Sequence, residues 1–486
     1  MRRTVVLLLV VLGLGVPTPG ASAEQRLVTI AAPSAGNVDP SRVSFNGSDH
    51  PRELRANVLL PDGYDEARDY PVLYLLHGVG DAYDAWAKPT RGDIVNTARG
   101  FEGIVVMPEA ARGFYANWWN GGRRGDPGWE RYYLDELIPL MEQRFSIRPG
   151  RRWHAIAGLS MGGLGSTFLA TQLPGYFGSS ASFSGFVSHQ RPEVAPALSL
   201  VGGVSYEDIF GPPDAFYATG HNPTRLTDNL RSTRLYVTVG DGTPQPGVAS
   251  EPAAIVGGGA LEAGLRPQSE DLVTAARASG VDTTYRPKQG VHDWPYWRQH
   301  LRDAIEWGFF APVVESPSEW TYRTAAQMGD MWGLSYRFGA PPEEVETFTR
   351  TGNRLAGAGS GTVSIRTQAG CVLTATLPFE RELPVTCTAT RPVAITGTVT
   401  PRRARAGQRT RFRFRASTPT GPLATATIRF AGRTVRTDGR GRATMVARLG
   451  PGRHRARFTS SGLRPATVTV NARATRRADP APRFTG

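Results

Sequence analysis

The sequence lacks any hydrophobic run long enough to cross a membrane. The run at its start, Val5–Val16, has twelve residues, whereas a spanning helix needs about 20. Two arginines precede this run, and the small residues Ala-Ser-Ala follow it at positions 21–23. This order predicts a secretory signal peptide over residues 1–23, with an uncleaved anchor as the alternative. We therefore expect a secreted, extracellular protein.

Cysteine is almost absent, because the chain has only Cys371 and Cys387. No histidine lies between or near them, so we expect no metal site there. The two residues lie in a β-rich stretch, separated by fifteen others. In a secreted protein this arrangement predicts a disulfide between them, with two buried thiols as the alternative.

The C-terminal segment lacks lysine and has almost no acidic residues. From Arg391 to the end there are 22 arginines and two aspartates, a net charge of +20, whereas the preceding residues carry −6 of the total +14. Such a segment is expected to attract anionic envelope polymers or acidic lipid surfaces. Nucleic acid would be attracted equally, but the predicted export argues against that partner. A merely solvated arginine-rich face remains the alternative.

The length of 486 residues predicts two or three domains. Residues 24–50 are expected to be an irregular lead-in. Apolar runs then alternate with helical patterns, which predicts a mostly parallel, helix-covered sheet and an α/β catalytic domain over 24–312. A strand followed by a Pro-Asp-Gly turn is predicted within residues 53–64. The other predicted strands are 72–76, 104–107, 154–157, 235–239 and 283–287, and the predicted helices are 129–145, 269–280 with a Ser269 cap, and 294–310.

After residue 315 the pattern becomes one of short β-like runs broken by glycine and proline. Residues 316–390 predict a small β domain closed by the disulfide. Residues 391–475 alternate strongly, which predicts a basic immunoglobulin-like β-sandwich. We expect the tail, 476–486, to be disordered.

One short stretch carries the first chemical signal. Ser160 follows an apolar run at 154–157 and precedes small residues and a helical pattern, in the order Gly-x-Ser-x-Gly. The pentapeptide alone is weak evidence in a glycine-rich chain. Its strand–turn–helix setting is typical of the turn that holds a nucleophilic serine at the edge of an α/β-hydrolase sheet.

A serine nucleophile needs a base, and the base needs a carboxylate to orient it. His292 is the best candidate base, because it follows the last predicted strand in the chain order of α/β-hydrolases. His154 is expected to be structural and His300 solvated. For the acid, position alone favours Asp241, directly after a predicted strand, over Glu262.

Five stretches together resemble the esterase D-type family, most closely its mycolyltransferase (antigen 85) branch. The resemblance covers about residues 40–310 and leaves out the C-terminal modules. It implies an α/β-hydrolase fold, Glu262 rather than Asp241 as the acid, and an oxyanion hole formed by the N–H groups of Val79 and Met161. The stretches are YLLHGVGDAYDAW, MPEAARGFYANWW, AIAGLSMGGLGS, VTVGDGTP and GVHDWPYW.

The sequence departs from this branch at the positions that hold the sugar trehalose. Mycolyltransferases carry an aspartate and an arginine there, and this chain has His77 and Gly80. The aromatic positions remain, as Trp118 and Trp294. The resemblance therefore implies His77, Trp118 and Trp294 as substrate contacts but leaves trehalose recognition in doubt.

These observations predict a secreted serine esterase that cleaves acyl esters through Ser160, His292 and Glu262, with no metal or cofactor. An acyltransferase that moves the acyl chain to a sugar or glycerol hydroxyl would use the same residues. A non-catalytic envelope-binding protein that acts through the basic module is the alternative from another class.

Overall fold

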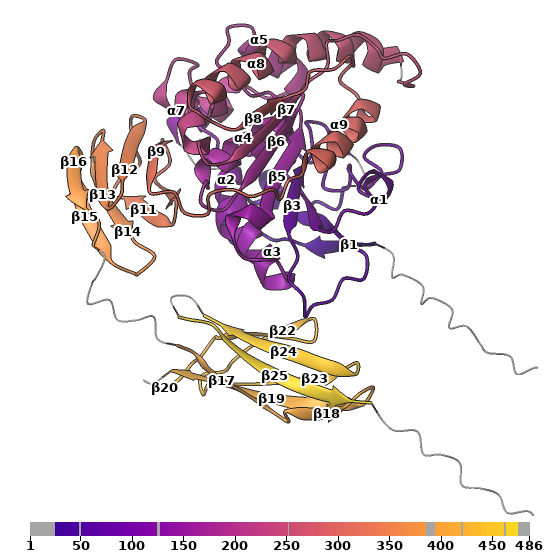
Figure 1. Cartoon of the computed structure of the whole chain (residues 1–486), viewed down its shortest axis with the longest axis vertical. Helices are drawn as coiled ribbons and strands as arrows, with labels where there is room; N and C mark the ends of the chain where they lie inside the picture. Colours follow the sequence, from indigo (N-terminus) through magenta and orange to yellow (C-terminus); the bar gives the residue numbers. More distant parts are fainter. Residues whose placement is uncertain are drawn as a thin grey trace, which may run out of the picture.

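The computed structural model describes residues 25–47, 50–123, 127–250, 252–384, 394–418, 421–460 and 463–474. The predicted signal peptide, Cys387 and the predicted disordered tail lie outside these residues. Within the described residues, no helix has the length and apolar character needed to span a membrane. Figure 1 shows an α/β body followed by two all-β units.

The α/β body is built on one eight-stranded sheet in the order β1-β2-β4-β3-β5-β6-β7-β8. β1 and β2 pair antiparallel, as do β2 and β4, and the other neighbours are parallel. Every residue of β3, β4 and β5 is buried, as expected for strands covered on both faces. The strands are Arg26–Ala31 (β1), Arg55–Leu60 (β2), Val72–Leu76 (β3), Ile104–Pro108 (β4), His154–Leu159 (β5), Ser179–Phe183 (β6), Arg234–Thr238 (β7) and Thr283–Tyr285 (β8).

Two of these strands were not expected. β1, of sequence RLVTIA, lies in the predicted irregular lead-in. It is an edge strand with no fully buried residue, although Val28 and Ile30 pack against the core. β6 has the sequence SSASF, which has no apolar run, yet all five residues are buried between β5 and β7. Small side chains fit there because α4 packs closely on the sheet.

Helices cover both faces of the sheet (Figure 1). One face is packed by α3 (Ile138–Arg144), α4 (Met161–Gln172) and α8 (Gly259–Ala278), and the other by α1 (Ile94–Thr97) and α9 (Trp294–Trp307). The predicted helix 129–145 is confirmed as α2 (Trp129–Arg131), a π-helical turn at Tyr132–Leu137 and α3. The predicted cap at Ser269 is wrong, because α8 begins ten residues earlier.

The early start of α8 brings Gly259 against the loop after β7. Gly259 packs so closely that an added Cβ would lie 2.7 Å from the carbonyl oxygen of Gly242, the loop after β7. Only glycine permits this approach. The extension places Glu262 in the first turn of the helix, facing the carboxyl edge of the sheet.

The first all-β unit consists of two four-stranded antiparallel sheets, β10-β11-β14-β15 and β16-β13-β12-β9, around an aromatic core. It is fastened to the α/β body by β9, where Asn229 bonds the backbone N–H and C=O of Arg323. Cys371 is buried here, and its predicted disulfide stays a prediction. The strands are Glu319–Thr324 (β9), Met328–Met331 (β10), Leu334–Phe338 (β11), Glu346–Thr351 (β12), Arg354–Ala358 (β13), Thr362–Arg366 (β14), Val372–Thr376 (β15) and Phe379–Glu382 (β16).

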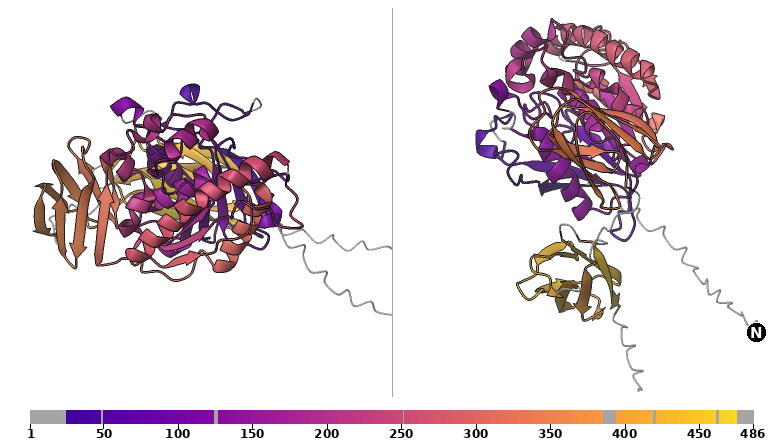
Figure 2. Two further views of the ribbon diagram at one scale, coloured as in Figure 1. Left: turned by 90° about the horizontal axis from the view of Figure 1, so that it is seen from above. Right: turned by 90° about the vertical axis from the view of Figure 1, so that its left-hand side faces the viewer.

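The C-terminal unit also has two sheets that enclose their own apolar core (Figure 2). One sheet contains β17, β19, β20 and β23, and the other has the order β18-β25-β24-β21-β22. The immunoglobulin-like topology stays a prediction. The strands are Thr396–Thr400 (β17), Arg403–Arg405 (β18), Arg409–Thr418 (β19), Gly421–Pro422 (β20), Thr427–Phe430 (β21), Arg433–Arg436 (β22), Arg442–Arg448 (β23), Gly452–Thr459 (β24) and Ala466–Arg473 (β25).

Candidate active site

Ser160 lies in a sharp turn between β5 and α4. Its backbone has φ 53° and ψ −116°, a conformation that a residue with a side chain rarely adopts. Its N–H donates to the carbonyl of Phe183 at 2.9 Å, and its own carbonyl accepts from Gly163 and Leu164. These bonds hold a strained, partly exposed serine at the carboxyl edge of the sheet, the geometry of a nucleophile elbow.

Glycines make this turn possible. A Cβ on Gly158 would lie 2.3 Å from the carbonyl oxygen of Gly162. A Cβ on Gly162 would lie 2.6 Å from the carbonyl oxygen of Leu76 and 2.7 Å from that of His77. The N-terminus of α4 is therefore packed directly against the ends of β3 and β5.

We expect Gly162→Ala to lower the free energy of unfolding by about 1–3 kcal/mol, because the added methyl collides with rigid backbone. Gly264→Ala is the matched control, since Gly264 lies inside α8 with no atom within 4 Å of an added Cβ. That variant should gain up to about 1 kcal/mol from helix propensity. Urea denaturation of both measures the difference, and equal effects would contradict this reading of the turn.

A buried glutamate and a histidine form the next part of the site. Nδ1 of His292 lies 2.7 Å from Oε2 of Glu262, which is fully buried in the first turn of α8. The other oxygen, Oε1, accepts from Oγ of Ser184 at 2.6 Å and from the N–H of Gly240. Burial opposes the charge on Glu262, but the bond to His292 and these donors outweigh it and lower its pKa. Glu262 is thus held as a carboxylate that orients His292.

Asp241, the acid favoured by position alone, is placed differently. Its Oδ1 accepts from the N–H and Oγ1 of Thr243 at 2.8 and 2.7 Å, so it stabilises the turn after β7. Asp293, the neighbour of the base, caps α9 through a bond from the N–H of Trp294. Neither carboxylate bonds His292 in the described part of the chain.

His292 and Ser160 lie at the same edge of the sheet. The bonds of Glu262 to Ser184 and Gly240 fix His292 beyond the ends of β6 and β7, and Ser160 directly follows β5. The hydrogen bonds of the described residues do not join Ser160 Oγ to His292. The imidazole packs edge-on against Trp297 of α9, with ring centroids 4.8 Å apart.

The two predicted oxyanion donors, Val79 and Met161, flank the elbow. Met161 is the first residue of α4, and Val79 lies in the turn after β3. This turn touches the elbow, because a Cβ on Gly78 would lie 3.5 Å from Cβ of Ser160. Among the described residues neither N–H has a protein acceptor. Both are free to bind a negative oxygen at the N-terminus of a helix, where the dipole favours it.

The three predicted substrate contacts differ in their exposure to solvent. His77 is only 1% exposed, its Nε2 accepts from the N–H of Ala110 at 3.0 Å, and its Nδ1 bonds the carbonyl of Gly78 at 2.8 Å. Both ring nitrogens are used, so the expected substrate contact by His77 is corrected to support of the oxyanion loop. Trp118 and Trp294 are partly exposed, and their substrate role stays a prediction.

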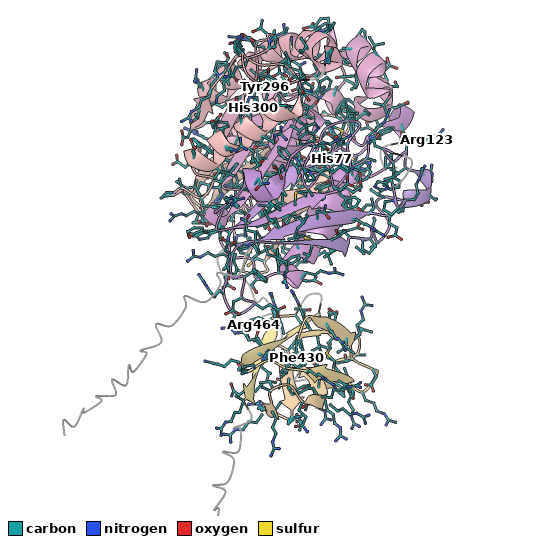
Figure 3. All side chains as sticks on the ribbon, turned by 90° about the vertical axis from the view of Figure 1, so that its right-hand side faces the viewer. His77, Arg123, Tyr296, His300, Phe430 and Arg464 are labelled. Atoms are coloured by element: carbon teal, nitrogen blue, oxygen red, sulfur yellow. The ribbon has the colours of Figure 1, made fainter. Side chains whose placement is uncertain are left out.

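Two histidines expected to lie outside the chemistry are both buried. His154 bonds backbone carbonyls, as a structural residue would. His300, expected to be solvated, is 2% exposed on α9 (Figure 3), and burial lowers its pKa to about 4. His300 lies three residues after the buried Trp297 and four before the buried Ala304, on the face of α9 that packs on the sheet.

Sequence reasoning missed Ser184 and Gly240. Ser184 directly follows β6, and Gly240 lies two residues after the end of β7. Functional groups gather at this edge of a parallel sheet, where the strands end. That position is the signal that could have identified them. Their own types, a serine and a glycine in a chain with 56 glycines, carry no chemical signature.

Comparisons with known proteins identify the family of the α/β body. The family described as "Putative esterase" matches residues 48–307. Esterase Rv1288 of Mycobacterium tuberculosis is 33% identical over 205 residues, covering 39% of this chain and 43% of that protein. The Diacylglycerol acyltransferase/mycolyltransferase Ag85C of Mycobacterium avium is 29% identical over 246 residues, covering 47% and 67%.

Among solved structures, the crystal structure of Mycobacterium tuberculosis MPT51 (FbpC1) aligns with a TM-score of 0.45 and 23% identity. The alignment covers 58% of this chain and 98% of that one. The matched region spans less than half of the length of the first curated relative.

Proposed function

Because the chain belongs to the family described as "Putative esterase", we propose that it is a secreted serine esterase that cleaves acyl esters. The observation that carries this proposal is the buried Glu262–His292 pair at the same sheet edge as the strained Ser160. The N-terminal pattern of residues 1–23 supports the proposed export.

In the proposed mechanism, Oγ of Ser160 attacks the ester carbonyl and Nε2 of His292 takes its proton. This needs Ser160 Oγ and Nε2 of His292 to come within hydrogen-bond reach of each other. Glu262 holds the Nδ1 proton of His292 and stabilises the imidazolium that forms. The tetrahedral oxyanion binds the N–H groups of Val79 and Met161, each worth about 3 kcal/mol in such sites.

Collapse of the tetrahedral intermediate expels the alcohol, which receives the proton from His292 and leaves an acyl group on Ser160. His292 then removes a proton from the second nucleophile, which attacks the acyl-enzyme and releases Ser160. Water as that nucleophile gives hydrolysis. A sugar or glycerol hydroxyl gives acyl transfer with the same residues.

The environment of His77 favours hydrolysis over transfer to trehalose. Its two ring nitrogens are occupied by Ala110 and Gly78, and Gly80 has no side chain. The positions that hold trehalose in the resembling branch therefore offer no side-chain hydrogen bond to a sugar. Transfer to another hydroxyl is the second candidate, supported by the similarity to the Ag85C protein.

Product analysis separates these candidates. The full chain is incubated with acyl esters of increasing chain length, with and without trehalose or glycerol. We expect free fatty acid as the main product under all conditions. Acyl-trehalose or acylglycerol as the main product would replace hydrolysis by transfer, and no turnover of any ester would favour the non-catalytic alternative.

A further inference from the structure

One face of the C-terminal unit is an exposed arginine surface. Along β19 the side chains alternate, with Phe412 and Phe414 buried in the core and arginines fully outward between them. β23 runs beside β19 and adds arginines on the same face. We call this set the arginine face: Arg409, Arg411, Arg413, Arg415, Arg442 and Arg448.

The arginine face contains like charges directly opposite one another. Arg409 is the cross-strand partner of Arg448, and Arg415 is that of Arg442. Like charges at such positions destabilise a sheet. Among residues 394–418, 421–460 and 463–474, no arginine forms a salt bridge with an acidic side chain. The unit therefore bears a concentrated positive charge, against which these residues hold one carboxylate, Asp438, beside Arg440 and Arg442.

A hollow lies at one end of this face. It has a volume of about 830 Å³ and is lined by strands from both sheets, β18, β19 and β25. Arg405 and Arg473 are themselves paired neighbours there. Its arginines are Arg403, Arg405, Arg409, Arg411 and Arg473. Five guanidinium groups around one hollow form a site for an anion that can accept hydrogen bonds from several of them at once.

We propose that the hollow and the arginine face bind a linear phosphodiester polymer built on a short polyol, such as a glycerol-phosphate chain. Alternate residues of a strand are about 7 Å apart and are separated by six backbone bonds. A phosphodiester-linked three-carbon unit also repeats every six bonds. Successive phosphates can therefore meet successive arginines of β19, each through a bidentate guanidinium contact.

The composition of the face argues against nucleic acid as the occupant. Single-stranded nucleic acids share the six-bond repeat but are bound with the help of aromatic side chains that stack on the bases. The aromatic residues of β19, Phe412 and Phe414, point into the core. Threonines and Val446 stand between the arginines instead.

The position of the face suits an anchor. Arg429 of β21, in the other sheet, is partly buried beside Glu66 and Tyr64 of the α/β body, and burial lowers its pKa. Figure 1 shows β22 and β24 on the side toward the α/β body and β19 on the far side. In Figure 3 nitrogen-tipped side chains radiate from the unit that contains Phe430 and Arg464. A bound polymer would leave the catalytic edge of the sheet open.

The test compares two quadruple variants of the full chain by fluorescence anisotropy with a labelled synthetic glycerol-phosphate polymer. The site variant replaces the hollow arginines Arg403, Arg405, Arg409 and Arg411 with threonine. The control replaces with threonine four exposed arginines of β22 and β24 that line neither the hollow nor the arginine face, Arg436, Arg453, Arg455 and Arg457, which removes the same charge. Threonine keeps the β-propensity of each strand, and circular dichroism and thermal melting verify folding.

We expect the site variant to bind at least tenfold more weakly at about 150 mM salt and the control to stay within threefold of the parent chain. The slope of log affinity against log salt should fall in magnitude by about 3 in the site variant. Equal losses in both variants would overturn the proposal in favour of diffuse charge. No binding by the parent chain, or tighter binding of oligothymidine or a carboxylate polysaccharide, would also overturn it.

Ester turnover of both variants is measured alongside and should be unchanged. The proposal does not depend on the esterase activity, so failure of one is distinguishable from failure of the other. If the site variant melts at a lower temperature than the control, a double variant with only Arg409→Thr and Arg411→Thr is tested in its place. We expect this double variant to bind the polymer at least threefold more weakly than the parent chain, and no loss of affinity would overturn the proposal.

Discussion

Ser160→Ala is expected to lower kcat/KM for a short p-nitrophenyl ester by about 10⁴-fold or more. In the proposed mechanism, the substitution removes the atom that forms the acyl-enzyme while leaving the elbow in place. Alanine keeps the Cβ and therefore the backbone strain at φ 53°. Initial rates of the purified variant and the parent chain measure the effect.

His292→Ala serves as the companion variant, because nucleophile and base act as one unit. Its loss should be of similar size, and the double variant should lose little more than either single one. Near-normal rates in either single variant would refute the assignment. Additive losses would mean that Ser160 and His292 do not act together.

Glu262→Gln should lower kcat/KM by about 10³- to 10⁴-fold, whereas Asp241→Asn should change it by less than about threefold. The amide keeps the size of the buried side chain but cannot stabilise the imidazolium. It also cannot accept from His292, Ser184 and Gly240 together, since one of its two arms is a donor. Rates with the same ester measure both variants.

Asp241→Asn is a demanding control because it alters a carboxylate on the neighbouring turn, whose bonds to Thr243 an amide oxygen can largely keep. A large loss in Asp241→Asn with a small one in Glu262→Gln would reverse the assignment of the acid. Both variants should unfold at temperatures close to that of the parent chain.

The sequence was most informative where the chemistry is local. The turn around Ser160 is encoded within a dozen consecutive residues, because a buried strand, a strained serine and close-packed glycines must all follow one another. The prediction of His292 as the base rests on its place between the last strand and a helix, whose start Asp293 and Pro295 mark.

Features set by packing between distant segments were not predictable in this way. Glu262 was reached only through a family resemblance, since nothing local shows that α8 begins at Gly259. His77 is buried and accepts from the N–H of Ala110, which follows β4 and is distant in the sequence. β6 was missed because its strand character comes from its two neighbours rather than from its own serines.

The most direct test of the account is mass spectrometry of the chain after reaction with a fluorophosphonate probe. The account predicts a single adduct, located on Ser160 after proteolysis, and its disappearance in Ser160→Ala. An unlabelled parent chain, or an adduct on another residue that survives in Ser160→Ala, would contradict it.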